Sequence, residues 1–248
     1  MRPIVTLLSD FGLADSYVAE MKAAILSDST DIRLVDISHE VPPGDIRAAQ
    51  YLLGRAWRRF PVGTVHLVVV DPGVGSSRRA IALRQQGHFF TGPDNGVLSA
   101  VLNDAEVVEL RIPRDASPTF QGRDVFAPAA ARLAEGEPVA GLGPPLANPV
   151  RLPAPEPRRG NGLVEGEVIY VDRFGTLIVN IPGEWVQRSQ GIEVAGKPAG
   201  AVRRTFADVE PGAFVGFVGS DGLLEIAVRD GSAARTLGAG VGAEVRVR

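Results

Sequence analysis

The chain has 248 residues, of which 45% are hydrophobic and 22% charged, and its formal net charge is −3. This is the composition of an ordinary globular protein, and without a basic excess we expect no nucleic-acid partner. The chain contains no cysteine, which excludes disulfides, thiolate catalysis and zinc–thiolate sites. No apolar run is long enough to cross a membrane, and the chain starts directly with a strand-like segment. We therefore expect no membrane partner and a cytoplasmic location.

The first half of the chain alternates segments typical of strands and of helices. Strands are predicted over 4–8, 32–37 and 65–70, with helices over 17–27 and after the capping residue Asp45. Further on, the sequence predicts short strands at 81–84, 89–91 and 107–110, a short helix over 97–102 and a longer helix that ends at Gly136. The order of strand then helix indicates a layered α/β domain with a mostly parallel central sheet.

The second half has a different character. Residues 138–162 are rich in proline and glycine without apolar periodicity, which is typical of a linker. Only short strands with glycine turns follow, and no helix of useful length fits. The strands are predicted at 164–171, 177–181, 192–194, 201–206, 214–218, 223–228 and 243–247. We predict an α/β domain over 1–150, a linker over 151–162 and an antiparallel β-barrel-like domain over 163–248.

Three carboxylates end buried strands of the first domain, namely Asp10, Asp36 and Asp71. Together they could bind the hydroxyls of a sugar such as ribose, or they could hold Mg²⁺. The three histidines lack the spacing of a transition-metal site, and a structural role is favoured for each of them.

The strand 65–70 runs into Asp71 and a Pro-Gly-Val-Gly turn, with Arg78 seven residues after the acid. Ligands of open α/β sheets bind beyond the carboxyl ends of the strands, so this is a candidate place for chemistry. An equally weighted alternative is that Asp71 only caps the turn and Arg78 is solvated. The loop lacks the P-loop and dinucleotide-binding motifs, which argues against ATP and NAD.

In the second domain, Asp172, Arg173, Phe174, Gly175 and Thr176 lie between two predicted strands. An aromatic ring with polar neighbours on such a loop could stack on a purine. A turn whose Phe174 fills the core is an equally good interpretation of the same residues.

Six short motifs occur in an order that resembles a known family. They are Ser9-Asp10-Phe11-Gly12 with Asp15, Asp71-Pro72-Gly73-Val74-Gly75 with Arg78-Arg79, Gly92-Pro93-Asp94-Asn95-Gly96, Thr119-Phe120-Gln121-Gly122-Arg123-Asp124, Asp172-Arg173-Phe174-Gly175, and Ser220-Asp221-Gly222. Together they resemble the S-adenosyl-L-methionine (SAM) hydroxide adenosyltransferases, the adenosine-forming SAM hydrolases related to the SAM-dependent fluorinase and chlorinase. Each motif is weak alone, but the resemblance spans nearly the whole chain.

The resemblance implies attack of water or hydroxide on C5′ of SAM, which yields adenosine and L-methionine. SAM is then the substrate, and no cofactor or metal is implied. The resemblance also implies a homotrimer with active sites between subunits. The substrate-binding residues that it implies are Asp10 for the ribose hydroxyls, Asp15, Ser220 and Asp221 for the methionine end, Phe174 and Phe206 beside the adenine, and Asp172 and Thr176 nearby.

The implied catalytic set is Asp71, Arg78 and Gln121. Gln121 is a departure, since the hydrolases carry histidine at this position, and a glutamine does not titrate near neutral pH. Hydrolysis is the leading hypothesis. One alternative is a catalytically weak or silent SAM- or adenosine-binding protein. A halogenase is less favoured, since the halogenases lack the acid at the Asp71 position.

Overall fold

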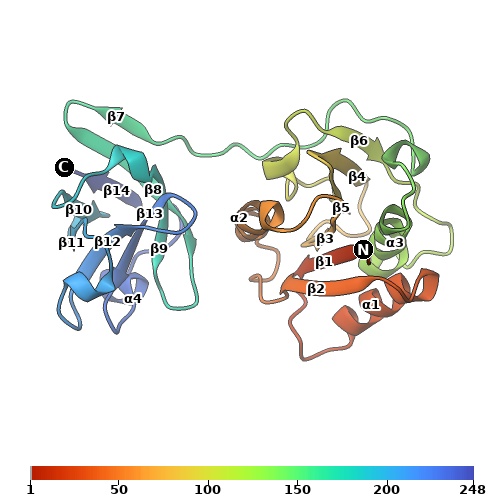
Figure 1. Ribbon diagram of the computed structural model, residues 1–248, viewed down its shortest axis with the longest axis horizontal. Coiled ribbons are helices and arrows are strands. Elements are labelled where there is room, and N and C mark those ends of the chain that lie inside the picture. The colour runs from red at the N-terminus through yellow and green to blue at the C-terminus, as the bar shows by residue number, and fades with distance from the viewer. Residues whose placement is uncertain (1) are drawn as a thin grey trace. The chain divides into compact units, whose positions relative to one another are not determined.

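The computed structural model describes residues 2–248. The chain divides between Leu152 and Pro153 into two compact units (Figure 1). The first unit contains three α-helices and a mixed sheet, and the second is built almost wholly of strands.

The first unit is organised around a six-stranded sheet with the order β2-β1-β3-β5-β4-β6. Strands β1, β2, β3 and β5 are parallel, whereas β4 runs antiparallel to both of its neighbours. All five residues of β3 are buried, as expected for a central strand covered on both faces. The strands are β1 (Ile4–Ser9), β2 (Arg33–Ser38), β3 (Val65–Val69), β4 (Ala80–Gln85), β5 (His88–Pro93) and β6 (Glu106–Glu109).

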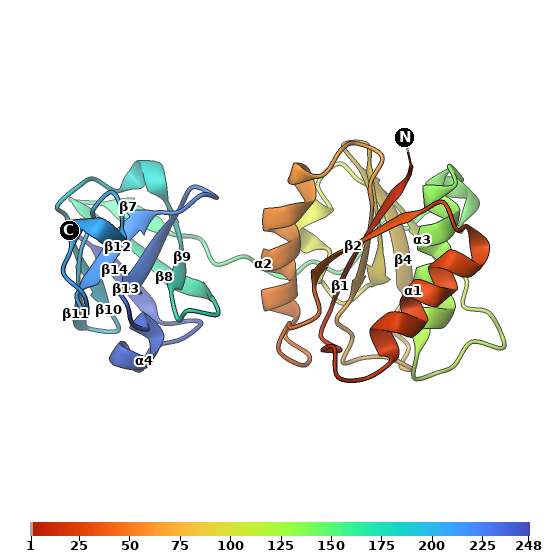
Figure 2. The same cartoon turned by 60° about the horizontal axis from the view of Figure 1, so that its bottom comes forward.

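Helices cover both faces of this sheet, with α2 (Ile46–Ala56) on one side and α1 (Tyr17–Asp28) and α3 (Ala127–Ala134) on the other (Figure 2). The carboxylate of Asp45 begins α2 by accepting a hydrogen bond from the backbone N–H of Ala48 at 2.9 Å. One turn of π-helix, Gly122–Phe126, precedes α3. The helix predicted over 97–102 is a single 3₁₀ turn, Ser99–Val101.

The second unit is an eight-stranded antiparallel sheet with the order β11-β10-β14-β8-β9-β13-β12, and β7 pairs with β8 beside this path. An isolated bridge between Val202 and Gly216 joins the segment after β11 to β12, so the sheet is a nearly closed barrel. The strands are β7 (Arg158–Gly160), β8 (Leu163–Val171), β9 (Leu177–Pro182), β10 (Gly191–Val194), β11 (Lys197–Ala201), β12 (Phe214–Val218), β13 (Leu223–Val228) and β14 (Glu244–Val247).

Some details of the second unit differ from the sequence prediction. The strand predicted over 201–206 is wrong, because β11 ends at Ala201 and a 3₁₀ turn covers Phe206–Asp208. The cause is local: a capping box between Thr205 and Asp208 starts a helical turn. A short helix, α4 (Ala233–Leu237), also forms where only strands were expected, capped by the hydroxyl of Ser232.

The predicted fold class is confirmed. A layered α/β unit with a mostly parallel sheet is followed by an antiparallel barrel-like unit. None of the helices within residues 2–248 combines the length and the apolar character that a membrane crossing requires.

Candidate active site

The acids that follow β1 and β3 lie at one edge of the first sheet. These strands are parallel neighbours, with Val5 opposite Val65 and Ser9 opposite Val69. Their carboxyl ends therefore coincide, which brings Asp10 and Asp71 to the same side, where ligands of α/β sheets bind.

A buried cluster of Asp71, Arg78 and Gln121 forms the centre of this edge. Arg78 donates to both carboxylate oxygens of Asp71, with Nε 2.9 Å from Oδ1 and Nη2 on Oδ2. The same Nη2 donates to Oε1 of Gln121. The side chains of Arg78 and Asp71 are only 9% and 6% exposed, so the charges are paired largely out of water. The next residue, Arg79, turns to Asp94 instead.

Two glycines allow the segments of the cluster to approach each other. Gly75 has φ +76°, and a Cβ built there would lie 2.8 Å from the carbonyl oxygen of Pro118. A Cβ at Gly122 would lie 3.1 Å from the sulfur of Met21 and 3.3 Å from a methyl group of Val69. The loop after β3 can therefore lie against the segment that carries Gln121, and that segment can pack onto the sheet.

A cavity of about 420 Å³ opens beside the cluster, and we call it the edge cavity. This volume is in the range of small-molecule sites. Asp10 keeps one oxygen engaged, since Oδ2 accepts a hydrogen bond from the N–H of Gly44 at 2.8 Å. The edge cavity is lined by Asp10, Phe11, Pro43, Gly44, Val69, Asp71, Pro72, Val74, Thr119, Phe120, Gln121 and Gly122.

Sequence reasoning missed the aromatic wall of this cavity. Phe11 and Phe120 line it, and their ring centroids lie 5.8 Å apart in an edge-to-face arrangement. Tyr17 completes the group, 5.6 Å from Phe11 and 5.4 Å from Phe120. The signal was present in the sequence, since the motif that carries Asp10 and the motif that carries Gln121 each contain a phenylalanine.

Charged residues anchor the segment that bears Phe120 and Gln121. Arg123 lies over the Phe120 ring, 4.9 Å from its centroid, and binds Asp124 and Glu20. The hydrogen bond from Arg123 is the main reason why the pKa of the Asp124 carboxyl lies below its usual value. Asp124 also accepts the backbone N–H of Ser117 at 2.8 Å, which ties both ends of the segment together.

Two predicted acids stand apart from the edge cavity. Asp36 binds Lys22 at 2.7 Å and lies 3.1 Å from Nε2 of His39. Burial acts to raise the pKa of Asp36, but the hydrogen bonds from Lys22 and His39 hold it below the usual value. Asp15 is exposed and does not line the cavity. Residues 2–248 contain no group of three or more metal-ligating side chains, and Asp36 does not join Asp10 and Asp71.

The histidines also lie outside the edge cavity. His66 is fully buried in the sheet, where Nδ1 lies 2.7 Å from the Thr6 hydroxyl and Nε2 lies 3.3 Å from Nδ1 of His88. Burial, with a smaller contribution from His88, lowers the pKa of His66 to about 3. His66 is therefore neutral at physiological pH.

The second unit gathers several of its predicted residues around a hollow of about 950 Å³ on the outside of the barrel. Phe174, on the β8–β9 turn, is 75% exposed. Phe206 is 43% exposed and packs on Phe217 with a centroid distance of 4.6 Å. Both rings line the hollow together with Asp172 and Thr176. Phe174 therefore does not fill the core, which removes one of the two interpretations of this turn.

The remaining predicted residues of this unit occupy other positions. Ser220 and Asp221 lie in the turn between β12 and β13 and are not among the residues that line the hollow. Oδ1 of Asp172 accepts the backbone N–H groups of Phe174 and Thr176 at 2.9 and 2.8 Å, so its side chain shapes the turn.

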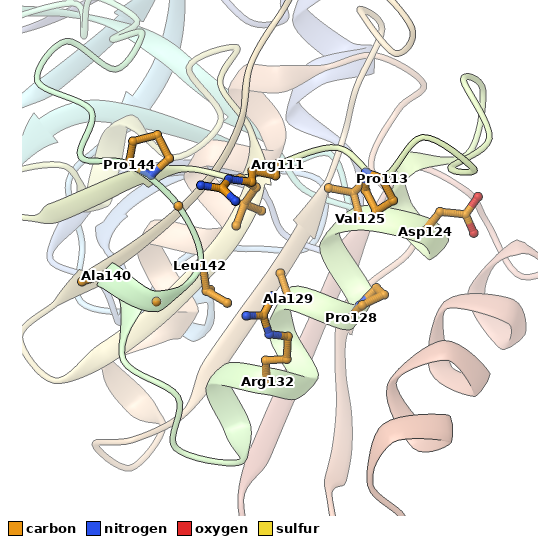
Figure 3. Close-up of a pocket in the computed structure, with 13 residues that line it drawn as sticks. Arg111, Pro113, Asp124, Val125, Pro128, Ala129, Arg132, Ala140, Leu142 and Pro144 are labelled. Atoms are coloured by element: carbon orange, nitrogen blue, oxygen red, sulfur yellow. The ribbon is translucent and has the colours of Figure 1, made fainter.

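A further hollow of the first unit lies between α3 and the segments that follow β6 and α3 (Figure 3). Its volume is about 470 Å³, and its wall includes Arg111, Arg132 and Leu142. None of the residues predicted for the site lines it. Of the predicted catalytic residues, Asp71 and Gln121 line the edge cavity, and Arg78 binds both of them.

Comparison with known proteins gives consistent matches over the whole chain. The chain is 44% identical to the (R)-S-adenosyl-L-methionine hydrolase of Thermus thermophilus, with 100% of both chains covered. It is 30% identical to the fluorinase of Nocardia brasiliensis, covering 99% of this chain and 97% of the relative. A crystal structure of an uncharacterised conserved protein from Thermotoga maritima superposes with a TM-score of 0.92 at 38% identity, covering 98% and 99% of the two chains.

The family assignment follows from both units. Residues 5–143 match the SAM hydroxide adenosyltransferase N-terminal domain, and residues 166–246 match the C-terminal domain of the same family. The resemblance inferred from the six motifs is confirmed. The chain belongs to the SAM hydroxide adenosyltransferase family.

Proposed function

We propose that this protein is an enzyme that hydrolyses SAM at C5′, giving adenosine and L-methionine. The observation that carries the proposal is the buried Asp71–Arg78–Gln121 cluster on the wall of the edge cavity. The relative from Thermus thermophilus, which the chain matches from end to end, is named (R)-S-adenosyl-L-methionine hydrolase.

The chemistry is favoured where bulk water is excluded from the reacting atoms. The leaving sulfur of SAM is a sulfonium cation, and the attacking oxygen is hydroxide or a partly deprotonated water. Charge is annihilated on the way to the transition state, which a dry site favours over bulk water. The oxygen forms a bond to C5′ while the C5′–S bond breaks. The electron pair of the C5′–S bond stays on sulfur, which becomes the neutral thioether of methionine.

In this mechanism, Arg78 supplies a fixed positive charge next to the nucleophile and Asp71 orients the water and accepts its proton. Because Arg78 binds both carboxylate oxygens, it also fixes the orientation of Asp71. Holding the water in line behind C5′ contributes part of the roughly 7–11 kcal/mol available from proximity and orientation. Asp10 is proposed to bind the ribose hydroxyls with the oxygen that Gly44 leaves free.

The second unit is proposed to bind the adenosyl and methionine ends of the substrate. Phe174 and Phe206 offer exposed aromatic surface for the adenine, near Thr176 and Asp172. Ser220 and Asp221 are proposed for the methionine end, with Asp15 of the first unit. A homotrimer with sites shared between subunits and a cytoplasmic location stay predictions, and light scattering tests the former.

The test is chromatography of SAM incubated with the purified protein, using each diastereomer at sulfur separately. Equal amounts of adenosine and methionine are expected from the wild type, and Asp71→Asn should lose most of the rate. Tight binding of SAM or adenosine in a calorimeter, with no methionine released over hours, would establish the silent binding protein instead. A halide-dependent 5′-halogenated nucleoside would identify a halogenase.

A further inference from the structure

The amide of Gln121 has a fixed orientation. The side chain is buried, with only 5% of the residue exposed, and its Oε1 accepts a hydrogen bond from Nη2 of Arg78. A guanidinium can only donate, so the amide oxygen must face Arg78 and the NH₂ group must face away from it. This orientation follows from hydrogen-bond chemistry, because the reverse would place two donors against each other.

The NH₂ group of Gln121 is left for a ligand. Among residues 2–248, no protein group accepts a hydrogen bond from Nε2, and this atom is not one of the fully buried atoms without a partner, so it is open to the edge cavity that the side chain lines. An amide donor that is open to a cavity and has no protein acceptor can be satisfied there by water or by a ligand. The cluster therefore presents an acceptor, Asp71, and a donor, Gln121, to the same cavity.

We infer that Gln121 donates a hydrogen bond from Nε2 to the nucleophilic oxygen, and that it serves as an anion-stabilising donor rather than as a base. This inference rests on the proposed function. The water donates one O–H to Asp71 and accepts Nε2–H from Gln121. As its proton passes to Asp71, the oxygen gains negative charge and forms the bond to C5′, the electron pair of the C5′–S bond goes to sulfur, and the proton leaves Asp71 for solvent.

The donor role explains how a glutamine can stand in this place. A hydrogen bond to a developing anion is stronger than one to a neutral oxygen, so the N–H stabilises hydroxide more than water. The group needs no change of protonation to do so. Gln121 thus contributes no ionisation to the pH dependence of the rate between pH 6 and 8, in contrast to a histidine.

The test compares Gln121→Glu with the wild type, since the two side chains have nearly the same shape. Both can accept from Arg78, but an ionised glutamate cannot donate into the cavity. We expect kcat to fall by about 10²-fold or more, the usual loss for one oxyanion donor, with adenosine affinity unchanged in a calorimeter. Gln86→Glu is the matched control, because Gln86 is exposed at the end of β4 remote from Arg78.

A second readout is the pH profile of kcat. The wild type should show no break near pH 6.5, whereas Gln121→His should introduce one. Full activity in Gln121→Glu, or a wild-type break near pH 6.5, would overturn the inference and leave the hydrolase assignment intact. If the wild type releases neither adenosine nor methionine, the proposed function fails and the inference fails with it.

Discussion

The buried histidine pair makes the first unit sensitive to acid in a range where few other groups titrate. His66 has its pKa lowered to about 3, first by burial and second by the nearby His88. In the unfolded chain, the pKa of a histidine is about 6.5. The unfolded state therefore binds a proton more readily than the folded state, and stability falls as the pH drops from about 6.5 towards 3.

The size of the effect follows from this difference in pKa. A pH of 5 lies about 1.5 units below the pKa of the histidine in the unfolded chain, so that histidine is protonated, while folded His66 is still neutral. At about 1.36 kcal/mol per unit, the first unit should lose about 2 kcal/mol of unfolding free energy between pH 7 and pH 5. Burial also lowers the pKa of His88, which acts in the same direction. Carboxylates such as Asp36 and Asp124, with lowered pKa values, titrate below this window.

Urea unfolding followed by tryptophan fluorescence measures this loss. The chain has two tryptophans, and the Trp57 ring lies 5.1 Å from His88. A Trp185→Phe background leaves Trp57 as the reporter, so that the transition of the first unit is read separately from that of the second.

The matched variant is His66→Gln, which can still hydrogen-bond to Thr6 but does not titrate. Its unfolding free energy should fall by about 2 kcal/mol less than that of the parent between pH 7 and pH 5. Equal losses in the parent and the variant would refute the reasoning.

Four further outcomes are expected. Arg78→Met should lower the unfolding free energy in urea by about 3–5 kcal/mol because it leaves the buried Asp71 carboxylate unpaired. Adding Asp71→Asn should recover much of this loss, and fully additive losses in the double variant would contradict the reasoning. Gly54 lies inside α2, where an added Cβ would be 3.6 Å from Cβ of Ala100, so Gly54→Ala should raise the unfolding free energy by about 0.5–1 kcal/mol; a lower urea midpoint would contradict this. Asp45→Ala should lower the unfolding free energy by about 1 kcal/mol because α2 loses its N-cap; an unchanged value would show that the cap does not stabilise the protein. Phe174→Ala should change stability by less than about 0.5 kcal/mol while raising KM for SAM; an unchanged KM would remove Phe174 from the site.

Much of the first unit was predictable because its strands are short apolar runs that end at polar turns. The run before Asp71 predicted β3, and the turn after it marked Asp71 and Arg78 as a candidate place for chemistry, with a solvated Arg78 as an equally weighted alternative. Parallel neighbours share a carboxyl edge, so the meeting of Asp10 and Asp71 also followed from the pattern. These features depend on local sequence and on general rules of α/β sheets.

Other features depend on contacts between distant segments. The antiparallel insertion of β4 between β5 and β6 leaves no periodic signal in the sequence. The bond between Arg78 and Gln121 spans 43 residues and requires Gly75 to pass close to Pro118, which no local pattern encodes. In the second unit, the sequence analysis predicted a strand over 201–206, but the side-chain contact between Thr205 and Asp208 favoured a helical turn.

The bridge that closes the barrel of the second unit limits how copies of that unit can associate. Unpaired strand edges are templates for strand addition and aggregation. At the seam, Arg203 donates its backbone N–H to Gly216 at 2.7 Å, which occupies groups that a foreign strand would need. The free edge of β7 carries the exposed side chains of Arg158 and Arg159 and follows a proline at 157. The peptide groups at the seam and along β7 are thus poor templates for the addition of a strand from another chain.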